Sequence, residues 1–540
     1  MSRFLNLSLT ITKNKLNTVE NFLRRNVVIL LAGLLTCISI FTYAIYLNNG
    51  MGLSYNDARS HLDIGRRVVE GLKPGLAQLG SVWLPLNHVL MIPLVWNDWA
   101  WHSGFAGAFW NMLSYVGTGL LVYKYLEKIK VGMVGRLFGV FIFASNLNIL
   151  YLQSTAMTEP LLLFTMMAGC YYLMLWMTED KLEDLIKSSF WIMLSTLVRY
   201  DGWFLLLVAA FLVALHTLFK KGYQTAEGVL LLFLTLSAFG VVLWFGWNLA
   251  IFKDPLYFAF GPYSAHAQQM QMLAAGALPT KGNPFLSLQI YLYSMIYNSV
   301  ATVAIGGIIA SIILWCDNKL QKGVRLATTA LWAPFFFNIV ALIFGFSVIF
   351  IQGISGNTWF NVRYGVMLMP SLAIFLGYLV HKLKDFRWVI IGLFLFVSFF
   401  AFTSNDAVSI DDARVGSSQK NVSEVSGWLQ KNAKDQKGFI LISAASHDAI
   451  IFSSMLPMKK FIHEGTGAYW ESATVAPDRW ARWIIMRTND VNDSTFKFVS
   501  KAPGFVKYNL VESFPFADIY QLKDQFLGDL NTEPIYGKQR

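Results

Sequence analysis

The sequence predicts an α-helical polytopic membrane protein with about eleven transmembrane helices and a small α/β domain at its C-terminal end. Three observations predict this fold class. The 540 residues are 55% hydrophobic and 14% charged, and the mean hydropathy of +0.48 is too high for a surface that faces water. Long apolar runs recur from residue 27 to residue 402. Beyond residue 403 the composition becomes charged and rich in turns.

The apolar runs define the transmembrane domain, because each lies near the ~20 residues that a helix needs to cross the hydrocarbon core. They cover residues 27–47, 105–125, 131–152, 160–177, 188–198, 203–219, 228–252, 290–315, 326–351, 364–380 and 388–402. The stretch 82–96 contains two prolines and ends in polar and aromatic residues, which predicts a re-entrant or interfacial segment.

Basic residues predict the orientation. Clusters at 24–25, 124–130, 220–221, 319–325 and 382–387 fall on one side if the spans alternate, and positive loops mark the cytoplasmic side. We therefore predict a cytoplasmic segment (1–26), a transmembrane domain (27–404) with external loops 48–104 and 253–289, and an extracytoplasmic α/β domain (405–540). The compact loops favour a bacterial inner (plasma) membrane. Membrane lipids are expected partners, whereas no basic face interleaved with aromatics predicts nucleic acid binding.

The C-terminal segment alternates helix and strand patterns, which is typical of a small α/β domain. The pattern predicts helices at 422–432 and 446–455, and strands at 438–443, 459–463, 482–487 and 506–514. Trp470, Trp480 and Trp483 fit the core of this domain or a platform on the membrane, with carbohydrate stacking as the alternative.

The loop 48–104 carries the densest chemistry. Apolar residues from Leu62 to Val69 are interspersed with arginines, a pattern that predicts a helix at the membrane surface with its cations toward lipid headgroups. Asp57 at the start of this helix could deprotonate an acceptor hydroxyl while cations such as Arg59 and Lys73 hold a leaving phosphate. The alternative role of Asp57, a helix N-cap, is compatible with this one.

Acids and bases at the external ends of later spans are further candidates. Glu159 precedes a proline at a predicted helix start, where a carboxylate complements the helix dipole and an ionisable group near the membrane indicates function. Arg199 and Asp201 bind substrate if they face one cavity, or else pair structurally. Arg363 either anchors its span at the interface or grips a lipid phosphate.

The loop 253–289 mixes aromatics and amides as sugar and headgroup sites do, so Tyr263 and His266 are candidate substrate contacts; a surface-lying connecting helix is the alternative. No metal site is predicted. All three cysteines lie in apolar runs or at the end of one, and the histidines of the C-terminal segment lack the number and spacing of a metal site.

The order of these motifs resembles the polyprenyl-phosphate-sugar-dependent glycosyltransferases of the GT-C superfamily, which include aminoarabinose transferases and protein O-mannosyltransferase-like enzymes. The resemblance covers roughly residues 25–405. It rests on the acidic residue after the first span, the proline-bearing stretch 82–88 with His88, and three later motifs that contain Glu159, Arg199-Tyr200-Asp201-Gly202 and Arg363-Tyr364. Asn56 stands where many relatives have a second acid, and Pro85-Leu86-Asn87-His88 stands where many have His-Pro-Pro.

The resemblance implies transfer of a sugar from a polyprenyl phosphate to an acceptor hydroxyl on the external face, with Asp57 as catalytic base and inversion at the sugar. Glu159 is the second catalytic candidate, and Arg59, Lys73, His88, Arg199, Asp201, Tyr263, His266 and Arg363 are the candidate substrate contacts. A lipid, a polysaccharide or a protein could be the acceptor, and a divalent metal is neither required nor excluded. The competing hypotheses are a flippase for lipid-linked sugars and a non-catalytic scaffold of envelope glycan assembly.

Overall fold

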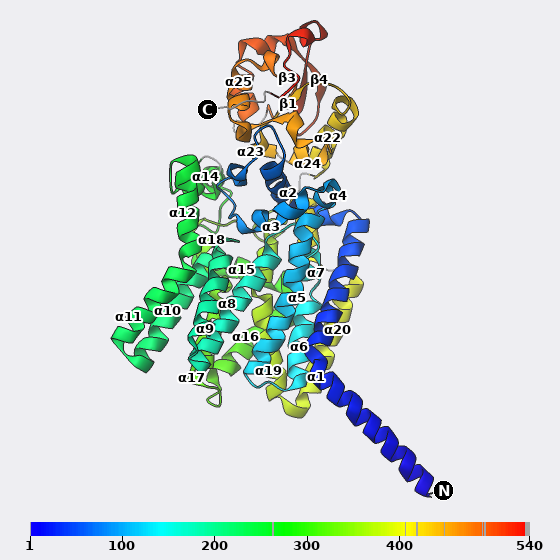
Figure 1. Ribbon diagram of the computed structural model, residues 1–540, viewed down its shortest axis with the longest axis vertical. Coiled ribbons are helices and arrows are strands. Elements are labelled where there is room, and N and C mark those ends of the chain that lie inside the picture. The colour runs from blue at the N-terminus through cyan, green and yellow to red at the C-terminus, as the bar shows by residue number, and fades with distance from the viewer. Residues whose placement is uncertain are drawn as a thin grey trace.

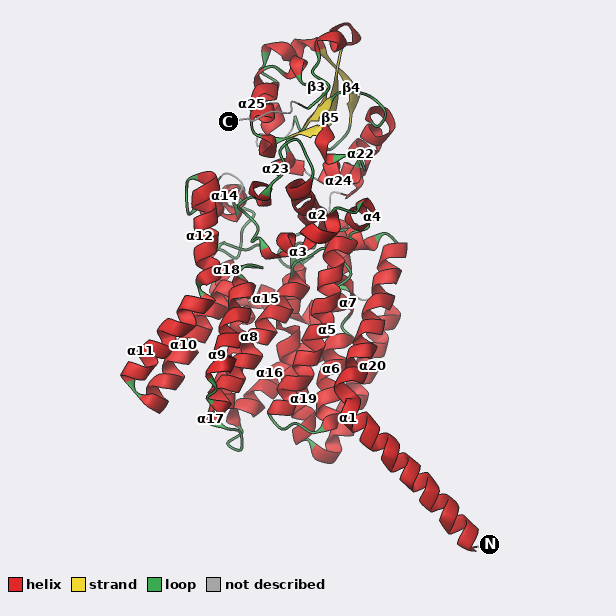
Figure 2. Cartoon of the chain, viewed as in Figure 1, coloured by secondary structure: helices red, strands yellow, loops and turns green. Residues whose placement is uncertain are grey.

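The computed structural model describes residues 2–261, 264–404, 407–416, 419–447, 449–488, 490 and 493–534. It consists of a bundle of long helices, a layer of short helices at one end of the bundle, and a domain beyond that layer which contains the five described strands (Figures 1 and 2). The predicted fold class, a helical membrane bundle with a small C-terminal α/β domain, is confirmed.

Among the described residues, seven helices are long and apolar enough to cross a membrane, and two bent pairs raise the number to nine if each pair is one span. The seven lie in α1 (Ser2–Asn48), α5 (Phe105–Lys128), α8 (Glu159–Glu179), α10 (Asp201–Lys221), α17 (Lys322–Thr328) continued by α18 (Ala333–Phe344), the 3₁₀ helix η4 (Val362–Leu368) continued by α19 (Met369–Lys382), and α20 (Arg387–Ser404).

The bent pairs are α11 (Tyr223–Ser237) with α12 (Phe239–Phe252), and α15 (Pro284–Ser299) with α16 (Ala301–Cys316). Two predicted runs remain. The run 131–152 forms α6 (Met133–Ala144) and α7 (Leu147–Leu152), and the run 188–198 lies mostly in α9 (Leu182–Thr196); all three helices are shorter than a full span. Each of the eleven apolar runs is thus largely helical, and eleven complete crossings stay a prediction.

The run 290–315 is not one continuous helix. α15 and α16 meet at an angle of 113°, and Val300 between them has a φ of 70°. A β-branched residue rarely adopts this left-handed backbone, so surrounding contacts must hold it there. The carbonyl oxygen of Asn298, near the end of α15, accepts hydrogen bonds from the side-chain amides of Asn146 (2.7 Å) and Asn148 (3.0 Å). These amides satisfy one backbone carbonyl that the break leaves free.

The helix α19 lies at the centre of the bundle. In the span formed by η4 and α19, 83% of the most apolar stretch is buried inside the protein, compared with 6% in the span that contains α20. Close packing of α19 against α6 depends on glycine, since a Cβ at Gly135 would lie 2.5 Å from the carbonyl oxygen of Gly377, and a Cβ at Gly139 would lie 2.9 Å from that of Ala373. The Gly135 and Gly139 pair is therefore a helix-packing motif.

Basic loops gather at the end of the bundle that lies away from the strand domain (Figure 1). Lys128 at the end of α5 pairs with Glu179 at the end of α8, and Lys221 at the end of α10 pairs with Asp180 at 2.7 Å. Lys382 of α19 pairs with Asp317, which follows α16. Since these loops contact one another, at least three of the predicted basic clusters share one end of the bundle.

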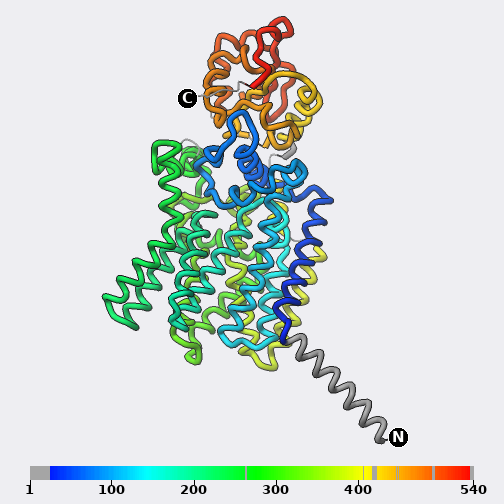
Figure 3. Tube along the Cα trace, viewed as in Figure 1, coloured from blue at the N-terminus to red at the C-terminus, as the bar shows by residue number. Residues whose placement is uncertain are grey.

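The opposite end carries a layer of short helices. They are α2 (Asn56–Val69), α3 (Leu86–Val95), α4 (Asp98–His102), α13 (Tyr257–Phe260) and α14 (Ala265–Ala274). Figure 3 shows the first part of this layer, in blue, between the bundle and the strand domain. The prediction that α2 lies on the membrane with its arginines toward headgroups is wrong. Arg66 is buried and contacts Asp98 at 2.6 Å, and Arg59 donates to Ser453 of the strand domain at 3.2 Å.

The C-terminal domain has a five-stranded mixed sheet in the order β2-β1-β3-β5-β4. β1 (Phe439–Leu441) is parallel to β2 (Phe461–Ile462) and to β3 (Ala481–Met486), whereas β5 (Asp518–Leu522) runs antiparallel to β3 and to β4 (Tyr508–Ser513). Its helices are α22 (Gln419–Ala433), α23 (Ala444–His447), α24 (Ala449–Ser453) and α25 (Ala468–Val475). Trp483 is buried in the core of the domain, as predicted. The strand β5 was not predicted.

A short helix, α21 (Val408–Gly416), follows α20 and precedes α22. It packs against α7 and η4 at the domain end of the bundle. The chain therefore returns to the membrane bundle before it enters the C-terminal domain.

Candidate active site

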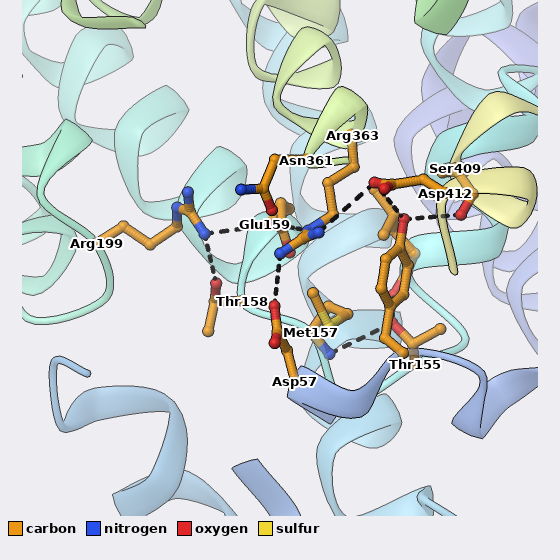
Figure 4. A network of polar contacts seen from close by, with 12 residues as sticks. Asp57, Thr155, Met157, Thr158, Glu159, Arg199, Asn361, Arg363, Ser409 and Asp412 are labelled. Carbon is orange, nitrogen blue, oxygen red and sulfur yellow. Dashed lines mark hydrogen bonds and ion pairs between the residues drawn. The ribbon is translucent and has the colours of Figure 1, made fainter. Parts of the chain in front are cut away.

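Arg363 forms the centre of a buried ionic cluster at the domain end of the bundle (Figure 4). Its Nη2 donates to Asp57 Oδ2 at 2.6 Å and its Nε donates to Glu159 Oε1 at 3.0 Å. Its Nη1 lies 3.6 Å from Asp412 Oδ2. Three carboxylates from three separate segments thus surround one guanidinium group, each facing a different nitrogen.

Glu159 connects Arg363 to a second arginine. Its Oε1 also lies 3.4 Å from Nη1 of Arg199, which in addition donates to Thr158 Oγ1 at 3.2 Å, while Nε of Arg199 contacts Asp201 Oδ2 at 3.3 Å. The guanidinium groups of Arg199 and Arg363 both lie over the ring of Tyr364, at 4.7 and 5.2 Å. The cluster therefore holds two cations and four carboxylates in contact with them.

Helix starts place two of these carboxylates. Glu159 and Asp201 lie in the first turns of α8 and α10, where negative charge complements the helix dipole, and Pro160 pre-sets the backbone at the start of α8. The chain before α8 is fixed by Asn111, whose amide donates to the carbonyls of Thr155 (2.8 Å) and Met157 (2.5 Å). Contacts with the preceding backbone thus help to set the position of Glu159.

The backbone around Arg363 is fixed by α15. Ser294 Oγ and Asn298 Nδ2 both donate to the carbonyl of Val362, at 2.7 and 2.6 Å. Gly365 permits this contact, because a Cβ there would lie 2.2 Å from the carbonyl oxygen of Ser294. Arg363 is therefore presented by a segment that has little freedom to move.

Asp57 is the exposed member of the cluster. Its side chain is 42% exposed, whereas those of Glu159 and Arg363 are 0% and 5% exposed. It lies in the first turn of α2, but the N-cap residue is Tyr55, whose side chain forms no capping hydrogen bond. The N-cap role that the sequence allowed for Asp57 is not observed, and its carboxylate points to Arg363 instead.

The sequence did not single out Asp412, which belongs to α21. Its side chain is 2% exposed and accepts a hydrogen bond from the hydroxyl of Tyr55 at 3.1 Å. The ring of Tyr55 lies 4.8 Å from the guanidinium carbon of Arg363. The only available sequence signal was a pair of adjacent acids, Asp411 and Asp412, nine and ten residues after the end of the last apolar run.

Four of the ten predicted site residues do not reach this cluster. Arg59 donates to the carbonyl of Leu53 at 2.9 Å and to Ser453, and Lys73 lies beside Gly467 of the C-terminal domain. The ring of His266 packs edge-on against Phe260. His88 is buried and its Nε2 lies 2.8 Å from Nδ1 of His61. Tyr263 lies outside the described residues.

The pair formed by His61 and His88 lies near the cluster. Burial, with smaller effects of the positive charges of Arg199 and Arg363, lowers the pKa of His61 to about 3. Burial also lowers the pKa of His88. Both rings are therefore neutral at physiological pH, and Trp83 covers the ring of His61 with 4.5 Å between ring centroids.

A metal does not fit the cluster as it stands. Within the part of the chain that the structure describes, no three His, Cys, Asp or Glu side chains are arranged to hold a metal ion. The carboxylates of Asp57, Glu159 and Asp412 do converge, but the guanidinium of Arg363 lies at the point where they meet.

Comparison with known proteins relates this architecture to two solved structures. The aminoarabinose transferase ArnT from Cupriavidus metallidurans, bound to undecaprenyl phosphate, matches with a TM-score of 0.53 and 10% identity, over 90% of this chain and 98% of that one. The Archaeoglobus fulgidus oligosaccharyltransferase, in complex with Zn and sulfate, matches with a TM-score of 0.51 and 10% identity, over 90% and 73% of the two chains. No family model and no curated protein matches the sequence.

Both neighbours belong to the GT-C superfamily, so this chain has a GT-C fold. The resemblance predicted from the sequence is confirmed for the fold, and it extends beyond the bundle, since the matches cover nine tenths of the chain.

Proposed function

We propose that this protein is a GT-C-type membrane glycosyltransferase that moves a sugar from a polyprenyl phosphate donor to an acceptor hydroxyl. The observation that carries the proposal is the cluster around Arg363, in which a half-exposed carboxylate, Asp57, lies in contact with a buried guanidinium group. Such a pair can supply both a general base and a phosphate ligand. The undecaprenyl phosphate bound to the ArnT neighbour supports this class of donor.

The charge balance of the cluster suggests how the donor binds. Four carboxylates contact the two arginines, so both guanidinium groups are neutralised in the free protein. A phosphate can bind Arg363 only by displacing a carboxylate. Asp57 is the carboxylate that solvent already reaches, so its release carries the smallest desolvation penalty. Donor binding then frees Asp57 to act as a base.

The reaction is a direct displacement. Asp57 takes the proton of the acceptor hydroxyl, and the oxygen attacks the anomeric carbon of the donor sugar. The bond from that carbon to the phosphate oxygen breaks, and its electron pair leaves on polyprenyl phosphate. Arg363 and Arg199 stabilise the charge that develops on the leaving phosphate. A single displacement inverts the anomeric configuration, so a product that retains it would contradict this mechanism.

The proposed site lies on the extracytoplasmic face. At least three basic clusters share the bundle end away from the C-terminal domain, and the positive-inside rule assigns that end to the cytoplasm. We therefore propose a multi-pass protein of a bacterial inner membrane with its C-terminal domain outside. The acceptor is a lipid, a polysaccharide or a protein that reaches the half-exposed side of Asp57.

The competing hypotheses receive less support. A flippase for lipid-linked sugars should carry its ionisable residues near the bilayer midplane. Here the described cluster lies at the domain end, in contact with the short helices above the bundle. A non-catalytic scaffold would tolerate replacement of Asp57, which the following experiment addresses.

The experiment measures transfer of radiolabelled sugar from polyprenyl phosphate donors to membrane acceptors, with wild type and Asp57→Asn at equal protein levels. Asp98→Asn is the matched control, because Asp98 belongs to the same external segment and also pairs with an arginine, Arg66. The side chain of Asp98 is far more exposed than that of Asp57. We expect transfer to fall by about 10²–10⁴-fold in Asp57→Asn, the usual contribution of a general base, and to persist in Asp98→Asn. Undiminished transfer in Asp57→Asn would refute the role of Asp57.

A further inference from the structure

We propose that Asp412 is a positioning residue of this active site, and that the helix α21 brings its carboxylate to Arg363. The inference rests on the proposed function, in which Arg363 binds the donor phosphate. In this proposal, Asp412 keeps the guanidinium plane of Arg363 in its orientation after Asp57 has been displaced from Arg363.

The three contacts of Arg363 are divided among its three nitrogens. Asp57 occupies Nη2, Glu159 occupies Nε and Asp412 faces Nη1. When a phosphate displaces Asp57 from Nη2, the other two carboxylates remain on either side of the planar group. Two fixed contacts on different nitrogens restrain rotation within the plane, so Nη2 keeps pointing to the place where the phosphate binds.

Tyr55 couples Asp412 to the same guanidinium group by a second route. Its hydroxyl donates to Asp412 Oδ2 at 3.1 Å and to the carbonyl of Ser409 at 2.7 Å, and its ring lies over Arg363. Asp412 thus fixes both a charge beside Arg363 and the aromatic ring on which Arg363 lies.

The attachment of α21 does not depend on the carboxylate of Asp412. The backbone N–H and the hydroxyl of Ser409 both donate to Asn148 Oδ1, at 2.9 and 2.7 Å, and Val408 and Ala413 are buried. Burial of a carboxylate is unfavourable unless it is paired. An acid at position 412 is therefore explained by its contacts with Arg363 and Tyr55 and not by the docking of the helix.

The adjacent acid provides a matched control. Asp411 is exposed, whereas Asp412 is buried in the cluster. The test compares Asp412→Asn with Asp411→Asn in the full-length protein, with steady-state transfer measured from an undecaprenyl-phosphate-linked sugar. We expect Asp412→Asn to raise the KM for the donor about tenfold or more, the usual effect of losing an interaction with a charged group, and to leave the KM for the acceptor unchanged. Asp411→Asn should stay within about twofold of wild type.

Two further variants separate positioning from a merely structural role. In an Arg363→Lys background, Asp412→Asn should have less than about a twofold further effect, because lysine has no guanidinium plane to orient. Asp412→Glu should recover part of the donor affinity by restoring the charge. The proposal would be overturned if the effects of Arg363→Lys and Asp412→Asn on the donor KM multiplied in the double variant. It would also be overturned if Asp412→Asn had the same donor KM as Asp411→Asn.

If Asp412→Asn fails to fold, Tyr55→Phe is the second test, since it removes the hydroxyl that contacts Asp412 and keeps the ring. It should raise the donor KM several-fold, and an unchanged KM would overturn the proposal. Asp57→Asn distinguishes failure of the proposed function from failure of the role of Asp412. Full transfer in Asp57→Asn contradicts the proposed function itself. If Asp57→Asn loses transfer but Asp412→Asn keeps the donor KM of wild type, only the role of Asp412 is contradicted.

Discussion

Replacement of Glu159 by glutamine should destabilise the free protein, because one carboxylate oxygen joins two arginines. Glu159 is fully buried and its Oε1 lies 3.0 Å from Arg363 Nε and 3.4 Å from Arg199 Nη1. Removal of one partner from a buried ion pair costs about 3–5 kcal/mol. Since Arg363 keeps Asp57 and Asp412 and Arg199 keeps Asp201, neither cation is left unpaired, and we expect a smaller cost of about 1.5–3 kcal/mol, the contribution of hydrogen bonds to charged groups.

The same helix offers a control at its other end. Glu179 of α8 pairs with Lys128 and Lys181 at a site where all three side chains are partly exposed, so Glu179→Gln should cost about 0–1 kcal/mol. Unfolding of both variants in detergent is measured with and without undecaprenyl phosphate.

The phosphate should stabilise Glu159→Gln more than wild type, because it supplies the negative charge that the substitution removes. A saturating ligand at 100 times its Kd stabilises by about 2.7 kcal/mol, which would offset most of the loss. Equal stability of the two glutamine variants, or equal stabilisation of wild type and Glu159→Gln by the lipid, would refute the assignment of an ionic bridge that a phosphate can replace.

Two further predictions concern the C-terminal domain and the backbone beside Arg363. Burial, with a smaller effect of the charge on Arg67, lowers the pKa of His463 to about 3, below its value of about 6.5 in an unfolded chain. Because the unfolded chain binds this proton more readily than the folded domain, the contribution of His463 to the free energy of unfolding is complete above about pH 6.5 and is lost as the pH falls. Between pH 7 and pH 5 the domain should lose about 2 kcal/mol in urea unfolding followed by pulse proteolysis. His463→Asn keeps an acceptor for the N–H of Gly465 and should lack this loss; the same pH dependence in both proteins would contradict the prediction. Gly365→Ala should cost about 1–3 kcal/mol and reduce transfer, because its Cβ would displace η4 from α15. Gly392→Ala on α20, where a Cβ meets nothing within 4 Å, is the control in both assays, and equal behaviour of the two variants would contradict the close contact.

The membrane bundle could be predicted from the sequence because a helix that crosses hydrocarbon must be long and apolar throughout. The run 290–315 marks the limit of that rule. It contains two glycines but no proline, and the break falls at Val300, whose left-handed backbone is imposed by its surroundings. Hydropathy reports whether a segment is apolar, and tertiary contacts decide whether it is straight.

The helix α2 was predicted, but its environment was not. Apolar residues alternating with arginines suit a helix between water and lipid, and they equally suit a helix between two parts of one protein. Arg59 contacts Ser453, and Arg66 pairs with Glu70 and Asp98, so neither arginine faces lipid phosphates. The pattern records an amphipathic surface and does not identify what covers it.

The candidate site was predicted in part, because acids and bases at helix ends near a membrane are rare enough to stand out. Asp57, Glu159, Arg199, Asp201 and Arg363 do meet in one cluster. Asp412 was missed because it lies in a segment whose composition resembles that of the C-terminal domain. Its role depends on a contact with Tyr55 across 357 residues of sequence, which no local pattern can report.

That separation has a consequence for the biosynthesis of the protein. The loop with Tyr55 and Asp57 leaves the ribosome early, whereas Ser409 and Asp412 follow the last span. A nascent chain with nearly every span inserted would still hold Arg363 without one of its three carboxylates. The cluster is completed only when α21 folds back onto the bundle, after the last span has been synthesised, so the proposed activity requires a fully assembled membrane domain.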